Sequence, residues 1–359
     1  MKAVKRYITT ILVVFLVAST SEAQEKFEVP KLSNPDSWTM IMVPDTQSYV
    51  KFARNQGILD LMTAWISENI QPLNIKMVLC TGDLVEQNEM IVPDNVNGNE
   101  PSRNQWLAVA RAFGRLDGKV PYVLAAGNHD YGYKSVEHRG SNYDVYFPAH
   151  KNAANSPLLS AAGKNANGHP TLENAAFEFV SPHGRKFLFM NLEFAPRDTI
   201  VQWAKGVSGQ EKYKDHTVAL LTHSYLNAKN EPIEKENYPI TDGNYGKALW
   251  EKLIQPSQNI QLVFSGHIGG ANDFKAHVGF KADKNTAGKK VNQMTFNAQA
   301  MGGGWHGNGG DGWLRILEFL PDGKTVVVHT YSPFFAASPT TKHLARSTEE
   351  FNDFSFTLD

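Results

Sequence analysis

Five short apolar runs in this chain each end within about three residues of a side chain that can bind a metal ion. Short apolar runs of this kind are typical of buried β-strands. Strand ends that meet at one edge of an open α/β sheet direct their polar groups into one crevice. The runs are Met40–Val43 before Asp45, Met77–Cys80 before Asp83, Tyr122–Ala125 before Asn128, His129 and Asp130, Val218–Leu221 before His223, and Leu262–Phe264 before His267.

The donor types at these strand ends indicate a metal centre. Two aspartates and an asparagine offer oxygen, and two histidines offer imidazole nitrogen. This mixture suits Zn, Mn or Fe. The pattern therefore predicts a metal-dependent hydrolase.

Length and charge narrow the class of protein. The chain has 359 residues, enough for one large α/β domain or two smaller ones. Its 35 Lys and Arg balance 36 Asp and Glu without a dense basic run, so we expect no dedicated nucleic-acid binding. Cys80 is the single cysteine, which excludes an intrachain disulfide, and we interpret it as a buried thiol.

The N-terminus predicts export. Basic residues between positions 2 and 6 precede the apolar run Ile8–Ala18, and small residues lead up to Ala23. This order is typical of a secretory signal peptide, here residues 1–23, and predicts a periplasmic or secreted protein. The alternative is a transmembrane anchor, but a run of eleven residues is too short to cross about 30 Å of hydrocarbon. We expect no membrane span after cleavage.

The rest of the chain alternates strand and helix patterns. Apolar residues recur at helical spacing from Ile58 to Ile70 and from Trp106 to Leu116. Residues 131–174, rich in Gly, Asn, Ala and Ser, show weak periodicity, which predicts a long loop bordering the site or, alternatively, a disordered surface insertion.

The C-terminal part is mostly strand. Hairpins are predicted for Phe177–Val180 with Lys186–Phe189 and for Trp313–Phe319 with Thr325–Thr330, and an edge strand for Phe351–Leu358. Without an interdomain linker, these elements predict a single domain over residues 24–359. Its fold class is α/β, a sandwich of two mixed β-sheets with helices outside.

The motifs resemble those of the calcineurin-like metallophosphoesterase superfamily. The resemblance covers about Trp38 to Pro333, and the first motif, with the late segment Thr330–Pro333, is similar to an exported bacterial branch. The motifs, in the family's order, are Asp45-Thr46-Gln47, Gly82-Asp83, Gly127-Asn128-His129-Asp130, Thr222-His223 and Ser265-Gly266-His267.

The resemblance implies a two-sheet sandwich with a dinuclear metal centre at the strand ends. Asp83 would bridge both ions. Asn128, His223 and His267 would complete what we call the second metal position, and Asp45 would belong to the first.

The resemblance also implies roles in catalysis for the residues after Asn128. His129 would protonate the leaving group or stabilise the charge of the transition state. Asp130 would orient His129 by accepting a hydrogen bond from its ring.

Two residues depart from the family pattern, both at the first metal position. Gln47 and Gly269 stand where the family has histidines. That position keeps Asp45, Asp83 and the side-chain oxygen of Gln47, which shifts its preference from Zn toward Mn, Mg or Ca. His306, Asn272 or Asp273 are candidates to compensate for the missing ligands.

These features predict hydrolysis of a phosphomonoester or phosphodiester with one or two divalent cations (Mn, Fe, Zn, Mg or Ca). The substrate class stays open among small-molecule, glycan and lipid phosphoesters. The alternative is a metal-binding but catalytically silent surface protein, or a glycan-binding protein on the same fold. Candidate rim and phosphate-binding residues are Tyr49, Trp305, Trp313, Arg103, Arg139 and Arg197.

Overall fold

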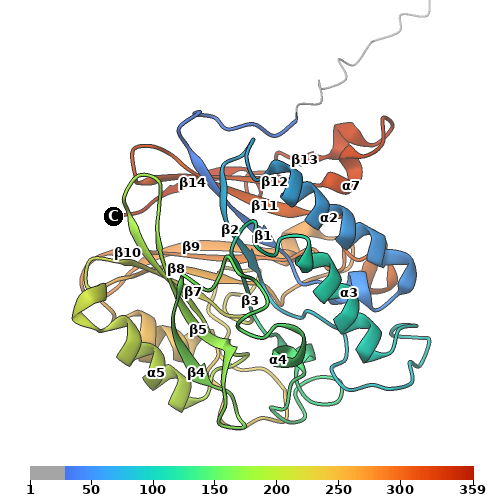
Figure 1. Ribbon diagram of the computed structural model, residues 1–359, viewed down its shortest axis with the longest axis horizontal. Coiled ribbons are helices and arrows are strands. Elements are labelled where there is room, and N and C mark those ends of the chain that lie inside the picture. The colour runs from blue at the N-terminus through green and yellow to red at the C-terminus, as the bar shows by residue number, and fades with distance from the viewer. Residues whose placement is uncertain (1–28) are drawn as a thin grey trace, which may run out of the picture.

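The computed structural model describes residues 29–359, which form two seven-stranded sheets facing each other (Figure 1). The predicted signal peptide, residues 1–23, lies outside the described residues. Both sheets are mixed, and helices flank them, as the sequence predicted. Over residues 29–359, the structure contains no helix with the length and hydropathy needed to cross a bilayer.

The first sheet, sheet A, contains the strands that precede Asp45, Asp83 and Asn128. β1, β2 and β3 are parallel neighbours, while β11 and β12 run antiparallel to their neighbours. The hairpin of β11 and β12 and an edge strand near the C-terminus were both predicted. The strand order is β13 (Arg346–Ser347), β12 (Thr325–Tyr331), β11 (Leu314–Phe319), β1 (Trp38–Val43), β2 (Ile75–Cys80) and β3 (Tyr122–Leu124), with β14 (Phe354–Thr357) also paired to β12.

The second sheet, sheet B, contains the strands that precede His223 and His267. β6, β7, β8 and β10 are parallel, and β4, β5 and β9 are antiparallel to their neighbours. The strand order is β4 (Leu159–Lys164), β5 (Pro170–Val180), β6 (Lys186–Asn191), β7 (Thr217–Leu221), β8 (Ile260–Ser265), β10 (Lys290–Phe296) and β9 (Val278–Lys284).

Side chains that alternate between the two faces of each strand form a hydrophobic core on both faces of sheet B. In β6, Phe187 and Phe189 point into the cluster between the sheets, whereas Leu188 and Met190 point into a second cluster beneath the helices. This is the period of two that a β-strand imposes on its side chains. The ring of Trp38 in β1 lies 5.8 Å from that of Phe187, so the two sheets pack directly on each other.

Helices cover the outer faces. α2 packs Leu59, Met62 and Ile66, spaced three or four residues apart, on sheet A beside α3, while α5 covers sheet B (Figure 1). The α-helices are α1 (Gln47–Val50), α2 (Gln56–Asn69), α3 (Ser102–Gly114), α4 (Tyr143–Tyr146), α5 (Asp198–Ser208), α6 (Gly246–Leu249) and α7 (Pro333–Ala336). A π-helix, Trp250–Ile254, follows α6, and the 3-10 turns are Ala53–Asn55, Asn128–Asp130, Glu211–Tyr213, Phe274–His277, Gly304–His306 and Lys342–Leu344.

The prediction that residues 131–174 border the site is confirmed at Lys134 and Ser135, which contact His129 and Asn128. The prediction that the segment is one long loop was wrong. The segment contains α4, β4 and the start of β5, and β4 forms one edge of sheet B. Its strand Leu159–Lys164 reads Leu-Ser-Ala-Ala-Gly-Lys and has no β-branched residue, so it lacks the usual strand composition. A Cβ on Gly163 would lie within 3.3 Å of the Trp203 ring of α5, so close packing explains the small residues.

Candidate metal centre

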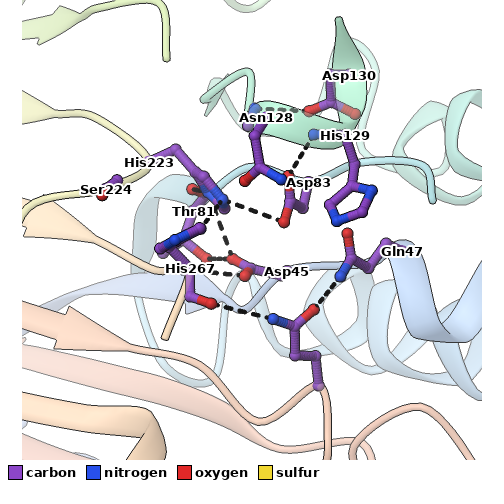
Figure 2. Close-up of polar contacts among 12 residues, drawn as sticks. Asp45, Gln47, Thr81, Asp83, Asn128, His129, Asp130, His223, Ser224 and His267 are labelled. Atoms are coloured by element: carbon purple, nitrogen blue, oxygen red, sulfur yellow. Dashed lines mark hydrogen bonds and ion pairs between the residues drawn. The ribbon is translucent and has the colours of Figure 1, made fainter. Parts of the chain in front are cut away.

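Residues that follow strands of both sheets lie close together (Figure 2). The ligand atoms of Asp83, His223 and His267 all lie within 4.8 Å of one another. Asp83 follows β2 of sheet A, whereas His223 and His267 follow β7 and β8 of sheet B. The structure thus brings three of the predicted ligands to one point between the sheets.

The local backbone at these ligands is strained, and adjacent glycines make room for them. φ is 43° at Asp83 and 72° at His267, a left-handed region that residues other than glycine adopt uncommonly. A Cβ on Gly127 would overlap Oδ1 of Asp83, and a Cβ on Gly266 would overlap Oδ1 of Asp45. These two motif glycines are therefore needed because the carboxylates pack against their Cα atoms.

Hydrogen bonds determine which nitrogen of each histidine is free. Nδ1 of His223 lies 2.8 Å from the carbonyl oxygen of Thr81, and Nε2 of His267 lies 2.5 Å from Oε1 of Glu236. Both partners accept, so these two ring nitrogens carry the protons. In the neutral rings, Nε2 of His223 and Nδ1 of His267 are then unprotonated, and they face each other at 3.1 Å.

The lone pairs of the two facing nitrogens repel each other unless a positive charge lies between them. Oδ2 of Asp83 also lies 3.1 Å from Nε2 of His223. Burial lowers the pKa of His223, but the carboxylates of Asp83 and Asp45 outweigh burial and raise it to about 10. A cation must therefore sit here, either a proton on Nε2 or a metal ion. Two nitrogen atoms that each bind one metal ion at about 2.1 Å can lie no more than about 4.2 Å apart, and the observed spacings are within that limit.

Two side-chain oxygens at the centre are buried without a hydrogen-bond partner, Oδ1 of Asn128 and Oε1 of Gln47. The amide nitrogen of Asn128 is held by Oγ of Ser135 at 3.0 Å, and that of Gln47 by Oε1 of Gln299. Unpaired buried carbonyl oxygens are costly and rare in folded proteins. A cation beside each would satisfy them, so the residues present fit a metal centre.

Asp45 is fully buried and tightly held. Its Oδ1 accepts from Thr81 Oγ1 at 2.7 Å, and its Oδ2 accepts from Asn297 Nδ2 at 2.6 Å and from the backbone N–H of His267 at 3.0 Å. Burial raises the pKa of Asp45 to about 6, with His223 offsetting part of that rise. Burial also raises the pKa of Asp83, but the charges of His223 and His129 outweigh burial and bring it below its usual range.

His129 lies on the opposite side of Asp83 from His223 and His267 (Figure 2). Its Nδ1 lies 2.7 Å from the carbonyl oxygen of Glu86 and 3.2 Å from that of Lys134, so Nδ1 carries a proton. Burial lowers the pKa of His129, but nearby Asp83 and Glu86 raise it by more. Nε2 is therefore the ring nitrogen that is left to give up a proton.

The expectation that Asp130 accepts a hydrogen bond from the His129 ring was wrong. The Asp130 carboxylate accepts from the backbone N–H groups of Leu84 at 3.0 Å, Val85 at 3.0 Å and Gly127 at 2.7 Å. The 3-10 turn points the two neighbouring side chains to different places. Burial and Asp83 raise the pKa of Asp130 to about 7. Asp130 thus fixes the loop after Asp83 to the Asn128 turn.

Four residues that sequence reasoning missed contribute to the centre: Thr81, Glu236, Asn297 and Gln299. Asn297 and Gln299 directly follow β10, which is parallel to β8, so a sixth strand end was a signal available in the sequence. Glu236 lies in a polar loop after β7 and had no comparable signal.

The residues expected to compensate at the first metal position have other partners. Oδ1 of Asn272 accepts from the backbone N–H groups of Gly303 and Gly304, and Oδ1 of Asp273 accepts from that of Lys275. His306 is exposed, and its carbonyl oxygen accepts from Arg54.

The candidate rim and phosphate-binding residues lie in different environments. Trp305 is 40% exposed, whereas Tyr49 and Trp313 are core residues. Arg139 binds Asp242 at 2.9 Å and Arg197 binds Glu193 at 2.7 Å, so both arginines have carboxylate partners. Arg103 lines a groove beside Trp106 on α3.

The chain is similar in sequence to a curated bacterial protein and in structure to a solved protein. The chain is 28% identical over 300 residues to the uncharacterized protein YvnB of Bacillus subtilis (strain 168), a match that covers 83% of this chain. The match spans about a fifth of the length of that relative (20%). Among solved structures, GAP50, the anchor in the inner membrane complex of Plasmodium, matches with a TM-score of 0.45 and 12% identity over 90% of this chain and 89% of that chain.

The family match covers the strand ends described above. Residues 41–270 match the calcineurin-like phosphoesterase family, a span that begins within β1 and ends just after His267. All five predicted motifs lie inside it. With its two mixed sheets, flanking helices and buried cluster of carboxylates and imidazoles, the chain belongs to the calcineurin-like phosphoesterase family.

Proposed function

We propose that this protein is a metal-dependent phosphoesterase that hydrolyses a phosphomonoester or a phosphodiester. The observation that carries the proposal is the pair of facing nitrogens, Nε2 of His223 and Nδ1 of His267, 3.1 Å apart and beside the Asp83 carboxylate. Family membership supplies the reaction class, and the buried, unpaired oxygens of Asn128 and Gln47 supply further places for cation binding.

The chain's own residues divide the chemistry between them. Asp83, Asn128, His223 and His267 would hold a divalent cation at the second metal position, and Asp45, Asp83 and Gln47 one at the first. Bound divalent cations supply charge stabilisation for the phosphoryl oxygens and activate water for attack on phosphorus.

His129 would carry out the proton transfer. Its Nδ1 is held by the Glu86 carbonyl oxygen, which leaves Nε2 available for proton transfer. With its pKa raised, the ring holds a proton at Nε2 that it can donate to the leaving oxygen. Asp130 keeps the backbone around His129 in place rather than touching its ring.

The first test is a hydrolysis assay with a phosphomonoester and a phosphodiester, 4-nitrophenyl phosphate and bis(4-nitrophenyl) phosphate, in the presence of Mn, Zn, Fe, Mg or Ca. The wild type should hydrolyse at least one ester class. His129→Ala should lower the rate by about 100-fold or more, the usual range for loss of a proton-transfer group. Asp83→Asn should lower it at least as much, because it removes a carboxylate that both metal positions share.

A matched control is His216→Ala. His216 is also buried and lies beside a carboxylate, Glu178, at 3.1 Å, but it precedes β7 on the far end of that strand from His223. Its loss should leave the rate unchanged. Inactivity of the wild type with every metal and ester, or full activity of Asp83→Asn, would contradict the proposal.

A second candidate function is a metal-binding protein without turnover, which the glutamine at 47 and the glycine at 269 favour. This candidate predicts bound metal and no hydrolysis in the same assay. Any activity that His129→Ala abolishes would exclude it.

We also propose that the protein is exported, on the basis of the leader-like residues 1–23. Expression of the full chain in a bacterial host, followed by fractionation and mass spectrometry, should give an N-terminus at Gln24. Recovery of the full-length chain from the cytosol would contradict export.

A further inference from the structure

We propose that the two metal positions differ in chemistry and that Gln299 creates the difference. In this proposal the first position is an all-oxygen site for a hard divalent cation such as Mn²⁺, Mg²⁺ or Ca²⁺. Gln299 is a positioning residue that turns the side-chain oxygen of Gln47 toward that cation. The inference rests on the metal-dependent function proposed above.

A chain of two amides fixes the orientation of Gln47. The carbonyl oxygen of His267 can only accept a hydrogen bond, and Nε2 of Gln299 donates to it at 3.1 Å. Oε1 of Gln299 must then face the other way, where Nε2 of Gln47 donates to it. Since each amide has one oxygen and one nitrogen, the backbone carbonyl determines both orientations.

The amide chain ends on an oxygen that has no partner. Gln47 is 4% exposed, and its Oε1 is buried without a hydrogen-bond partner among the described residues. Figure 2 shows this oxygen pointing toward His129 and Asp83. A buried carbonyl oxygen without a partner is unfavourable, so the fold holds the oxygen there against a free-energy penalty. A cation at this point would remove the penalty.

Asp45 and Asp83 supply the remaining oxygens. The Asp45 carboxylate accepts three hydrogen bonds, one on Oδ1 and two on Oδ2, so Oδ1 keeps a free lone pair. Asp83 lies between the histidine pair and Gln47 in Figure 2, so its carboxylate can serve both positions. The first position therefore offers carboxylate and amide oxygens, which are the ligands that Mg²⁺, Ca²⁺ and Mn²⁺ prefer.

Packing around Gly269 keeps a second imidazole out. A Cβ at this residue would lie 2.9 Å from the ring of His277 and 3.2 Å from Cη2 of Trp305. His277 is itself committed, since its Nδ1 lies 2.8 Å from the carbonyl oxygen of Asp273 and its Nε2 accepts from the N–H of Ala300. A neighbouring side chain thus fills the space that a histidine at 269 would need, and the first position stays without nitrogen ligands.

The second position has a different donor set. Its two imidazole nitrogens, with oxygens from Asp83 and Asn128, suit Zn, Fe or Mn. We therefore expect one transition-metal ion held tightly at the second position and one hard cation held more weakly at the first.

The test is a metal titration of the metal-depleted full-length protein by calorimetry, with Mn²⁺ electron paramagnetic resonance as a second readout. After one equivalent of Zn²⁺ fills the second position, the wild type should bind one further Mn²⁺. Gln299→Leu, which removes the amide chain, should weaken binding of that Mn²⁺ by about 10- to 100-fold, as loss of a ligand-orienting group does. Zn²⁺ binding should stay unchanged.

Gln293→Leu is the matched control. Gln293 is a buried glutamine on β10 whose amide also bridges two partners, Tyr225 and Asp283. Its loss should leave both binding steps intact. If Gln299→Leu does not fold, Gln47→His replaces it, and this variant should make the first position prefer Zn²⁺ to Mn²⁺.

The outcomes separate this inference from the proposed function. A wild type that hydrolyses phosphoesters but binds one cation only, or a Gln299→Leu variant with unchanged Mn²⁺ affinity, would overturn the inference alone. Two distinct binding steps without hydrolysis of any ester would overturn the proposed function and leave the inference standing.

Discussion

Oε1 of Glu236 lies 2.5 Å from Nε2 of His267, and this contact decides which nitrogen of the ring faces the metal centre. Oγ of Ser224 donates to the other carboxylate oxygen of Glu236 at 2.8 Å and holds it in place. Carboxylates that accept from a metal-binding histidine orient its ring and raise its basicity. Glu236 thus acts on the second metal position through His267.

Replacing Glu236 with glutamine should weaken metal binding at the second position. The amide removes the charge that holds the proton on Nε2 of His267, and loss of such a partner usually lowers metal affinity by about 10- to 100-fold. Competition with a chromogenic chelator measures the change. Glu234→Gln is the control, because Glu234 lies in the same loop but pairs with Lys247 in solvent. Equal affinities in the two variants would refute the role of Glu236.

Alanine at Gly127 should disrupt the centre. The added Cβ would overlap the carboxylate and the backbone N–H of Asp83, so the strained loop has to shift. We expect a loss of about 1–3 kcal/mol in the free energy of unfolding, together with loss of metal binding.

Gly206→Ala should have the opposite effect on stability, since nothing lies within 4 Å of the added Cβ and the residue is in helix α5. It should stabilise the protein by about 0.5–1 kcal/mol in denaturant unfolding.

Metal removal should lower the thermal stability. Without cations, the buried carboxylates of Asp45 and Asp83 and the facing imidazoles lose their compensating charge. A ligand at 1,000 times its Kd adds about 4 kcal/mol to the free energy of unfolding. EDTA should therefore lower the Tm in calorimetry, and added Mn²⁺ should restore it. The Tm of Asp83→Asn should respond little to either treatment, and an equal response would contradict the assignment of Asp83.

His277 should make stability depend on pH. Its burial lowers its pKa, so in acid the unfolded chain takes up a proton at His277 before the folded protein does. Its contribution to stability is therefore present above the unfolded pKa of about 6.5 and is lost as the pH falls toward the lowered folded value, by at most about 1.4 kcal/mol per pH unit.

His277→Gln isolates this contribution. The difference in unfolding free energy between wild type and variant, measured by urea denaturation from pH 8 to pH 5, cancels the effects of all shared groups. The wild type should lose stability more steeply than the variant in acid. Parallel curves would show that His277 does not titrate differently in the folded state.

Much of the fold was predictable because it follows local patterns. Strands such as β2 contain short apolar runs, here Met77–Cys80, and helix α2 repeats its apolar residues at helical spacing. β4 was missed because its alanines and glycine are chosen by packing against α5 and not by strand propensity. Strand propensity is an average over many packing environments, whereas the residues of β4 pack against one particular neighbour, helix α5.

In the metal centre, too, some features were predictable from the sequence and others depended on the tertiary structure. The ligand types at strand ends were visible in the sequence, as were the substitutions Gln47 and Gly269. The adjacent residues His129 and Asp130 looked like a hydrogen-bonded pair, yet the turn that contains them sends each side chain to its own backbone partners. Adjacency along a chain does not fix the direction of side chains.

The sequence by itself determined many of the strands, helices α2 and α3, the type of donor at five strand ends and the absence of two family histidines, because these depend on residue identity and spacing. Only the tertiary structure decided that Gln299 orients Gln47 across 252 residues, that Glu236 sets the tautomer of His267, and that His277 fills the space beside Gly269. The physical reason is that hydrogen-bond direction and steric exclusion depend on how distant segments pack together.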